Sequence, residues 1–215
     1  MKEVEFSYLY KDIKPIEDLY ENPIQIIIRD QYLDTDDRAL EKNGLVFRIR
    51  SNSYKPIKIL YTLKGKTTIN KHTRIPERLE EETTDVIQAA KILNKYAGIS
   101  FKEKLKSVVQ LRQTKRTMYT QYGFEMCLDE TKFLDSDVVY NSIELESTKN
   151  GDIAPFLELH NRLVNEFGCI LWEHSKFAVG KAIQALGFKN MILGDKEMNQ
   201  IDQYYKQLRR IMNNI

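Results

Sequence analysis

The sequence predicts an α+β fold, mainly antiparallel β, in which eight strands close into a barrel and helices pack on the outside. Three observations lead to this fold class. Charged and apolar residues alternate with a period of two over many short segments in the first two thirds of the chain. The polar faces of these segments repeat the same charged residue types. Several amphipathic helical segments are available to cover the apolar faces.

Eight segments show this alternation, and an even number of strands suits a closed antiparallel barrel without free edges. Each strand then has one charged and one apolar face. Because helices can bury the apolar faces from outside, we expect the charged faces to point inward. The predicted strands are Glu3–Leu9, Ile24–Asp34, Gly44–Asn52, Ile57–Lys64, Thr73–Glu82, Val108–Thr120, Gly123–Glu130 and Ser142–Thr148.

Helical spacing predicts four helices. The first has Asp85 near its start and Gly98 just past its end, which are typical helix-boundary residues. The predicted helices are Thr84–Tyr96, Ile153–Phe167, Phe177–Leu186 and Lys196–Met212. We therefore expect a barrel domain over residues 1–190 and a C-terminal helical extension over residues 191–215.

The composition argues against several classes of protein. With 33 basic and 31 acidic residues, the net charge of +2 predicts neither a nucleic-acid nor a membrane partner. No apolar stretch approaches the roughly 20 residues that span a bilayer, and no basic-then-apolar leader opens the chain, so we expect a soluble cytoplasmic protein. Cys127 and Cys169 have no zinc-finger spacing, which argues against a disulfide framework or zinc site.

The charged faces carry both acidic and basic pairs. A single pair of this kind is more often a solvated outer face, but agreement among several strands favours a site. Carboxylates suit Mg²⁺ or Mn²⁺, and arginine and lysine suit phosphate oxygens, so we predict a metal-bound, phosphate-rich ligand inside the barrel. A lipocalin-like carrier would need an apolar interior. The acidic pairs are Glu3 with Glu5, Glu80 with Glu82, and Glu144 with Glu146; the basic residues are Arg48 with Arg50, Arg112 with Arg116, and Lys64.

A series of short motifs follows this pattern in a fixed order along residues 1–186. In that order the chain resembles the CYTH family of triphosphate tunnel metalloenzymes, which includes class IV adenylyl cyclases, thiamine triphosphatases and inorganic triphosphatases. The motifs are Glu3-Val4-Glu5, Tyr32-Leu33-Asp34-Thr35, Gly44 to Arg50, Thr62 to Gly65, Arg78 to Glu82, Arg116 with Tyr119, Leu128-Asp129-Glu130, Ile143 to Glu146, and Ser175-Lys176.

The resemblance implies roles for individual residues. Glu3, Glu5, Glu144 and Glu146 would be the catalytic residues and would bind Mg²⁺ or Mn²⁺. Glu80 and Glu82 would be further metal ligands. Phosphate oxygens are then bound by Arg48, Arg50, Lys64, Arg78, Arg112, Arg116 and Lys176. From its position alone, Lys176 also fits a surface lysine in the first turn of a helix.

The resemblance favours a metal-dependent triphosphatase acting on ATP, inorganic triphosphate or thiamine triphosphate. An adenylyl cyclase that makes cyclic AMP and pyrophosphate would use the same triphosphate-binding residues. A catalytically weak binding module is the third candidate, because Ser7, Thr114 and Ser142 stand where the family usually has charged residues. The sequence leaves the choice between monomer and homodimer open.

Three other residues have a structural interpretation that we favour. Asp34 is expected to cap a helix at Arg38–Lys42 rather than bind metal. Asp129 is expected to form a salt bridge with an arginine inside the barrel rather than to contact metal. His160 falls on an apolar helix stripe typical of a core histidine.

Overall fold

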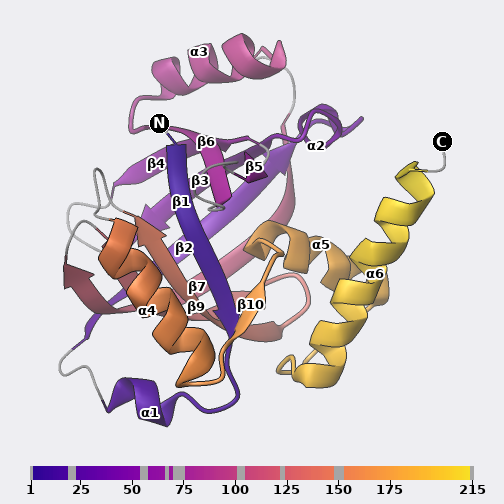
Figure 1. Ribbon diagram of the computed structural model, residues 1–215. Helices are drawn as coiled ribbons and strands as arrows, with labels where there is room; N and C mark the ends of the chain where they lie inside the picture. The colour runs from indigo at the N-terminus through magenta and orange to yellow at the C-terminus, as the bar shows by residue number, and fades with distance from the viewer. Residues whose placement is uncertain are drawn as a thin grey trace.

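The computed structural model describes residues 2–18, 23–53, 58–65, 68–69, 76–100, 105–121, 124–147 and 153–213. Figure 1 shows a strongly curved sheet with helices packed around it. The predicted α+β, mainly antiparallel class is confirmed. The described elements are β1 (Lys2–Leu9), α1 (Lys14–Glu17), β2 (Ile24–Asp34), α2 (Ala39–Lys42), β3 (Val46–Asn52), β4 (Ile59–Lys64), β5 (Thr68–Ile69), β6 (Pro76–Thr83), α3 (Val86–Ala97), β7 (Lys106–Gln121), β8 (Phe124–Phe133), β9 (Val138–Ser147), α4 (Ile153–Asn165), β10 (Ile170–Trp172), α5 (Lys176–Leu186) and α6 (Asp195–Asn213).

The strands form one antiparallel sheet in the order β10-β1-β9-β8-β7-β2-β3-β4-β6-β5. Strand β1 also pairs with β6, which lies near the other end of that order. The paired residues are Lys2 with Leu79, Glu3 with Arg78 and Val4 with Glu77.

All eight predicted strands have a counterpart, with boundaries shifted by a few residues. The structure adds β5 and β10, which have two and three residues and are too short to show an alternating pattern. Four predicted strand ends, Ile57, Thr73, Gly123 and Thr148, lie outside the described residues.

Local signals set the helix boundaries. The Asp85 carboxylate accepts hydrogen bonds from the backbone N–H groups of Ile87 and Gln88 at the start of α3. Gly98 ends this helix in the left-handed conformation with φ 67°, which glycine adopts without strain. Helix α6 occupies the predicted C-terminal extension, and the division of the chain at residue 190 stays a prediction.

The apolar faces of the sheet are covered from outside by helices. Helix α4 packs on β1, β8 and β9 through Phe156 and Leu163, and α3 packs on β3 and β4 through Ile92 and Leu93. His160 accepts or donates a 2.7 Å hydrogen bond with the Tyr8 hydroxyl and stacks on Phe6, so the predicted core histidine is confirmed.

Helix α5 packs between α6 and the sheet, and α5 and α6 lie side by side in Figure 1. The contact with the sheet is close at Gly180. A Cβ atom there would lie 2.7 Å from Val109 Cγ1 and 2.9 Å from Phe133 Cε1. Val109 and Phe133 lie on the same face of the sheet as the charged residues described below, so the prediction that the helices pack on the outside is wrong for α5. This close approach brings the beginning of α5 to the charged residues.

Among the described residues, no helix is both long and apolar enough to cross a lipid bilayer. The predicted cytoplasmic location stays a prediction.

Candidate active site

Strand register gathers charged side chains of neighbouring strands on one face of the sheet. In an antiparallel ladder, directly paired residues project to the same face. Glu5 on β1 pairs with Glu146 on β9, which in turn pairs with Glu125 on β8. Lys115 on β7 pairs with Asp129 on β8. One charged group therefore extends across these four strands.

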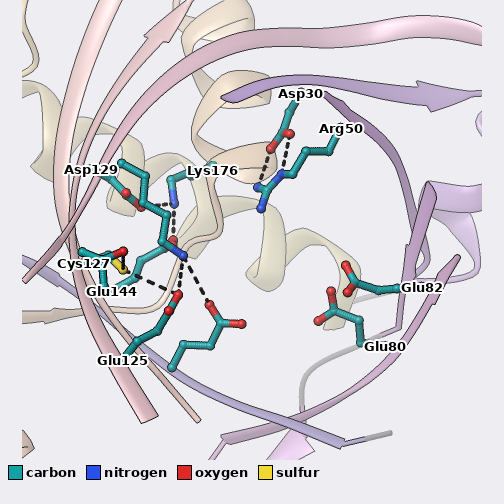
Figure 2. Close-up of polar contacts among 12 residues, drawn as sticks. Asp30, Arg50, Glu80, Glu82, Glu125, Cys127, Asp129, Glu144 and Lys176 are labelled. Atoms are coloured by element: carbon teal, nitrogen blue, oxygen red, sulfur yellow. Dashed lines mark hydrogen bonds and ion pairs between the residues drawn. The ribbon is translucent and has the colours of Figure 1, made fainter. Parts of the chain in front are cut away.

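The same face continues on the other half of the sheet. Asp30 on β2 pairs with Leu111, which lies four residues before Lys115 on β7 and so shares its face. Further pairs join Asp30 to Arg50, Arg48 to Thr62, Thr62 to Glu82, and Lys64 to Glu80. Figure 2 shows the labelled side chains of both groups pointing toward a common space inside the curved sheet.

A buried carboxylate on β2 holds the two arginines of β3. Arg50 Nε and Nη2 donate to the two carboxylate oxygens of Asp30, each at 2.7 Å. Arg48 Nη1 lies 3.6 Å from Asp30 Oδ2, and the Asp30 side chain is fully buried. Burial alone would raise the pKa of Asp30, but Arg50 and Arg48 hold it below its ordinary value. The two-bond pair fixes the plane of the Arg50 guanidinium.

Strand β6 adds two carboxylates next to these cations. Lys64 Nζ lies 3.0 Å from Glu80 Oε2, and Arg48 Nη2 lies 3.5 Å from Glu82 Oε1. The Thr62 hydroxyl accepts from Arg48 at 3.1 Å and donates to Glu82 at 2.9 Å. Arg48, Lys64, Glu80 and Glu82 therefore form one contact network.

On the acidic side, two lysines lie between carboxylates. Lys115 Nζ is 2.7 Å from Glu125 Oε1 and 3.9 Å from Glu146 Oε2. Lys176, the first residue of α5, donates to Asp129 Oδ2 at 2.8 Å and also to Glu144 Oε1. Burial alone would lower the pKa of Lys176, but Asp129 and Glu144 raise it well above its ordinary value. Lys176 therefore stays charged and neutralises part of the acidic group.

Cys127 lies on the same face, in register with Glu144. Burial raises the pKa of its thiol to about 12, so the sulfur is protonated at neutral pH.

Most of the predicted site residues meet on this face. The structure brings together Glu5, Glu80, Glu82, Glu144, Glu146, Arg48, Arg50, Lys64 and Lys176. Glu3 and Arg78 pair with each other between β1 and β6, and their side chains lie outside the described part of the structure.

The predicted pair Arg112 and Arg116 does not reach the charged face. Arg112 is exposed, and Arg116 donates to Glu17 of α1 at 2.7 Å. A β-bulge between Thr117 and Tyr119 inserts one residue into β7 and reverses the side-chain alternation across it. Alternation counted backward from Tyr119 therefore assigns the residues before the bulge to the wrong face of β7.

Three residues of the site were not predicted: Asp30, Lys115 and Glu125. Asp30 did carry a signal, because it is a charged residue between apolar Ile28 and Tyr32 in a strand with period two. Lys115 is nearly buried and follows the inward-facing Gln113 by two residues, so both side chains lie on the same face of β7. The inward-facing residue at this point of β7 is therefore a lysine, and not Thr114 as the sequence predicted. Ser7 and Ser142 do lie on the charged face, in register with Glu144 and Asp129.

The structural roles predicted for two aspartates are confirmed. Asp34 accepts from the backbone N–H groups of Leu40 and Glu41 in the first turn of α2, at 2.9 and 3.1 Å. Asp129 forms the predicted salt bridge, but its partner is Lys176 and not the predicted arginine.

The donor chemistry of the charged face fits a hard divalent cation, because carboxylate oxygens are the ligands such cations prefer. Asp129 Oδ1 is a buried acceptor without a hydrogen-bond partner among the described residues, and Arg48 Nε is a buried donor of the same kind. Within the described part of the chain, no group of three or more His, Cys, Asp or Glu side chains is already close enough to hold a metal ion. Lys115 and Lys176 lie between the carboxylates, so metal binding there requires the ammonium groups to move aside.

Fold and site together define an antiparallel α+β protein that presents acidic and basic side chains on the inner side of a curved sheet. A family model described as the CYTH domain matches residues 1–160, and the chain belongs to the CYTH family. The predicted family is therefore confirmed, and α5 and α6 lie beyond the matched residues.

Solved structures with a similar fold include three that match most of this chain. A candidate adenylyl cyclase from Hippeastrum, described as having a dominant triphosphatase activity, is 16% identical with a TM-score of 0.65, covering 84% of this chain and 95% of its own. A protein from Pyrococcus horikoshii OT3 is 21% identical with a TM-score of 0.56, covering 85% and 99%. A candidate adenylate cyclase from Bacillus halodurans is 18% identical with a TM-score of 0.59, covering 86% and 97%. At these sequence identities, the similarity to the solved structures shows the fold alone. A search of curated protein sequences found no match to the chain.

Proposed function

We propose that this protein hydrolyses triphosphate groups of small molecules with a divalent metal ion, inside a barrel closed by eight of its strands. The pairing of β1 with both β9 and β6 supports closure. The observation that carries the function is the meeting of Arg48, Arg50 and Lys64 with the carboxylates of β6, β8 and β9 on one face. A triphosphate complexed with metal needs both kinds of group at once.

The basic side binds the phosphate oxygens in this proposal. Asp30 fixes Arg50 and lies close to Arg48 before any ligand arrives, so little reorganisation is needed when phosphate binds. Lys64 extends the basic group along β4, and Arg78 of β6 is included on its sequence motif alone. Arg112 and Arg116 are omitted because they lie on the other face of β7.

The carboxylates of β1 and β9 would hold the metal: Glu3, Glu5, Glu144 and Glu146, with Glu80 and Glu82 as a second group. When bound, Mg²⁺ or Mn²⁺ supplies Lewis-acid chemistry that polarises phosphoryl oxygens and makes water a better nucleophile. Lys115 and Lys176 exchange their carboxylate contacts for phosphate contacts as the ligand enters, and they neutralise charge that develops on the leaving phosphate. Phosphoryl transfer depends mainly on such positioning and charge neutralisation.

Cyclisation of ATP to cyclic AMP and pyrophosphate is the second candidate. The Hippeastrum and Bacillus halodurans proteins described as candidate adenylyl cyclases support it, since both share this fold. A binding module with weak catalysis is the third. Ser7 and Ser142 support that candidate, because both put a neutral side chain on the charged face.

Phosphorus-31 NMR tests the proposal. The protein is incubated separately with tripolyphosphate, ATP and thiamine triphosphate, with Mg²⁺ or Mn²⁺ at mildly alkaline pH. Metal-dependent orthophosphate supports the hydrolase, pyrophosphate with cyclic AMP replaces it by the cyclase, and metal-dependent line broadening without products replaces it by the binding module. Glu144→Gln should abolish turnover, and Glu158→Gln, on the exposed side of α4, is the matched control.

A further inference from the structure

The segment of residues 173–178, which contains Lys176, is attached to α6. The Tyr205 hydroxyl donates to the backbone carbonyl oxygen of Ala178 at 2.7 Å. Two residues before Lys176, His174 Nε2 lies 3.4 Å from Asp202 Oδ1. The His174 ring also stacks on the Tyr205 ring, with centroids 4.7 Å apart and planes inclined by 28°. The segment is therefore held by α6 at both ends of a short stretch.

These contacts differ in how strongly they hold the segment on α6. The ion pair between Arg209 and Glu173, at 3.7 Å, joins two side chains that are more than half exposed, and it contributes little. His174 is buried and also meets the edge of Trp172 at 4.8 Å. The hydrogen bond from Tyr205 and the packed His174 ring are thus the contacts that restrain the segment.

The same segment directs Lys176 to the charged face. Ser175 caps α5 through its hydroxyl, which accepts from the backbone N–H of Ala178 at 3.3 Å. The Lys176 side chain is 9% exposed and its ammonium lies between Asp129 and Glu144. A lysine has four rotatable side-chain bonds, so its ammonium is placed reproducibly only when its backbone is fixed.

We propose that α6 positions Lys176 for ligand binding, with Tyr205 and His174 as the positioning residues. The contacts of α6 with the segment stand on the structure alone, and the ligand rests on the proposed triphosphate function. Helix α6 lies beyond the residues matched by the family model, so this support comes from the C-terminal part of this chain. The helix is therefore part of the site's architecture.

A purely structural role for α6 makes a different prediction. Met198 and Ile201 are buried against α5 together with Val179 and Ile183, and this apolar contact holds α6 in place without the Tyr205 hydroxyl. If burial of these side chains were the whole role of α6, removing the hydroxyl would leave Lys176 where it is. Tyr205→Phe separates the two roles, because it keeps the ring and removes one hydrogen bond.

The first test measures the accessibility of Lys176 without any ligand. Competitive acetylation with acetic anhydride, read by mass spectrometry, gives the reaction rate of each lysine relative to exposed Lys42. Tyr205→Phe should raise the rate at Lys176 by about fivefold, the equilibrium value of one net hydrogen bond. Lys115, equally buried but remote from α6 in the fold, should keep its wild-type rate, as should Lys176 in Tyr204→Phe. An unchanged Lys176 rate, or an equal rise at Lys115, would overturn the proposal.

The second test measures tripolyphosphate affinity by calorimetry in a double-mutant cycle. Tyr205→Phe should weaken binding about twofold to fivefold in the wild-type background and have no effect in a Lys176→Met background. Equal effects in both backgrounds would contradict positioning through Lys176. If wild-type protein binds no tripolyphosphate while the acetylation result holds, the proposed function fails and the positioning by α6 stands.

Discussion

Replacing Asp30 by asparagine should destabilise the protein strongly, because Asp30 is the buried partner of two arginines. The substitution keeps the volume of the side chain and removes its charge. It leaves Arg50 with one acceptor in place of the two that now lie at 2.7 Å, and it leaves Arg48 without the carboxylate at 3.6 Å. Removing one partner of a buried pair costs about 3–5 kcal/mol. The one charge-assisted hydrogen bond that Arg50 loses accounts for about 1.5–3 kcal/mol of this cost.

Urea unfolding at pH 7 measures this loss. With a slope of about 2 kcal/mol per molar urea, a loss of 4 kcal/mol lowers the unfolding midpoint by about 2 M. Asp135→Asn, in the exposed turn between β8 and β9, is the matched control and should leave the midpoint unchanged. The double variant Asp30→Asn/Arg50→Gln should recover part of the loss, because it removes the unpaired charge as well.

The stability that Asp30 contributes should depend on pH. Because Arg50 and Arg48 hold the pKa of Asp30 below its ordinary value, the stability from this group is present above about pH 4. It is lost as the pH falls through the folded-state pKa. The difference between wild type and Asp30→Asn should therefore be full at pH 7 and shrink below about pH 4. Equal midpoints at pH 7, or a difference that grows in acid, would show that Asp30 does not stabilise the fold through its charge.

Three further predictions follow from particular contacts. Gly180→Ala should destabilise the fold by about 1–3 kcal/mol in urea unfolding, although alanine favours helices, since its Cβ would lie 2.7 Å from Val109; Gly194→Ala, with its nearest contact at 3.4 Å, is the control, and a stabilised Gly180→Ala would contradict the packing. Arg112→Gln should leave tripolyphosphate affinity in calorimetry unchanged, whereas Arg48→Gln should weaken it at least tenfold; equal losses would return Arg112 to the site. Cys127 should react with Ellman's reagent only after unfolding, because burial raises the pKa of its thiol to about 12; rapid reaction of the folded protein at pH 8 would show an accessible thiolate.

Regular alternation explains why so much of the fold and site was predictable from the sequence. In β3, Arg48 and Arg50 alternate with Phe47 and Ile49, and a period of two assigns both faces of the strand without further information. The same holds for Glu144 and Glu146 in β9. Such residues were placed correctly because the local pattern and the tertiary environment agree.

Features that depend on tertiary structure could not be predicted in this way. The β-bulge in β7 changes which residues face inward, and no glycine or proline in Thr117–Tyr119 marks it. The burial of Lys176 depends on α5 packing closely against the sheet at Gly180, which requires residues distant in the sequence. Strand β10 has three residues, fewer than the alternation needs to be recognised.

Calorimetric titration of the wild-type protein with tripolyphosphate, with and without Mg²⁺, measures whether the charged face binds a metal–triphosphate complex. We expect saturable binding that Mg²⁺ strengthens. Lys64→Met and Glu144→Gln should each weaken this binding at least tenfold, whereas Arg112→Gln should not. Absence of binding at millimolar tripolyphosphate by a folded protein, or binding that is indifferent to Mg²⁺ and to both substitutions, would contradict a metal–triphosphate site on the charged face.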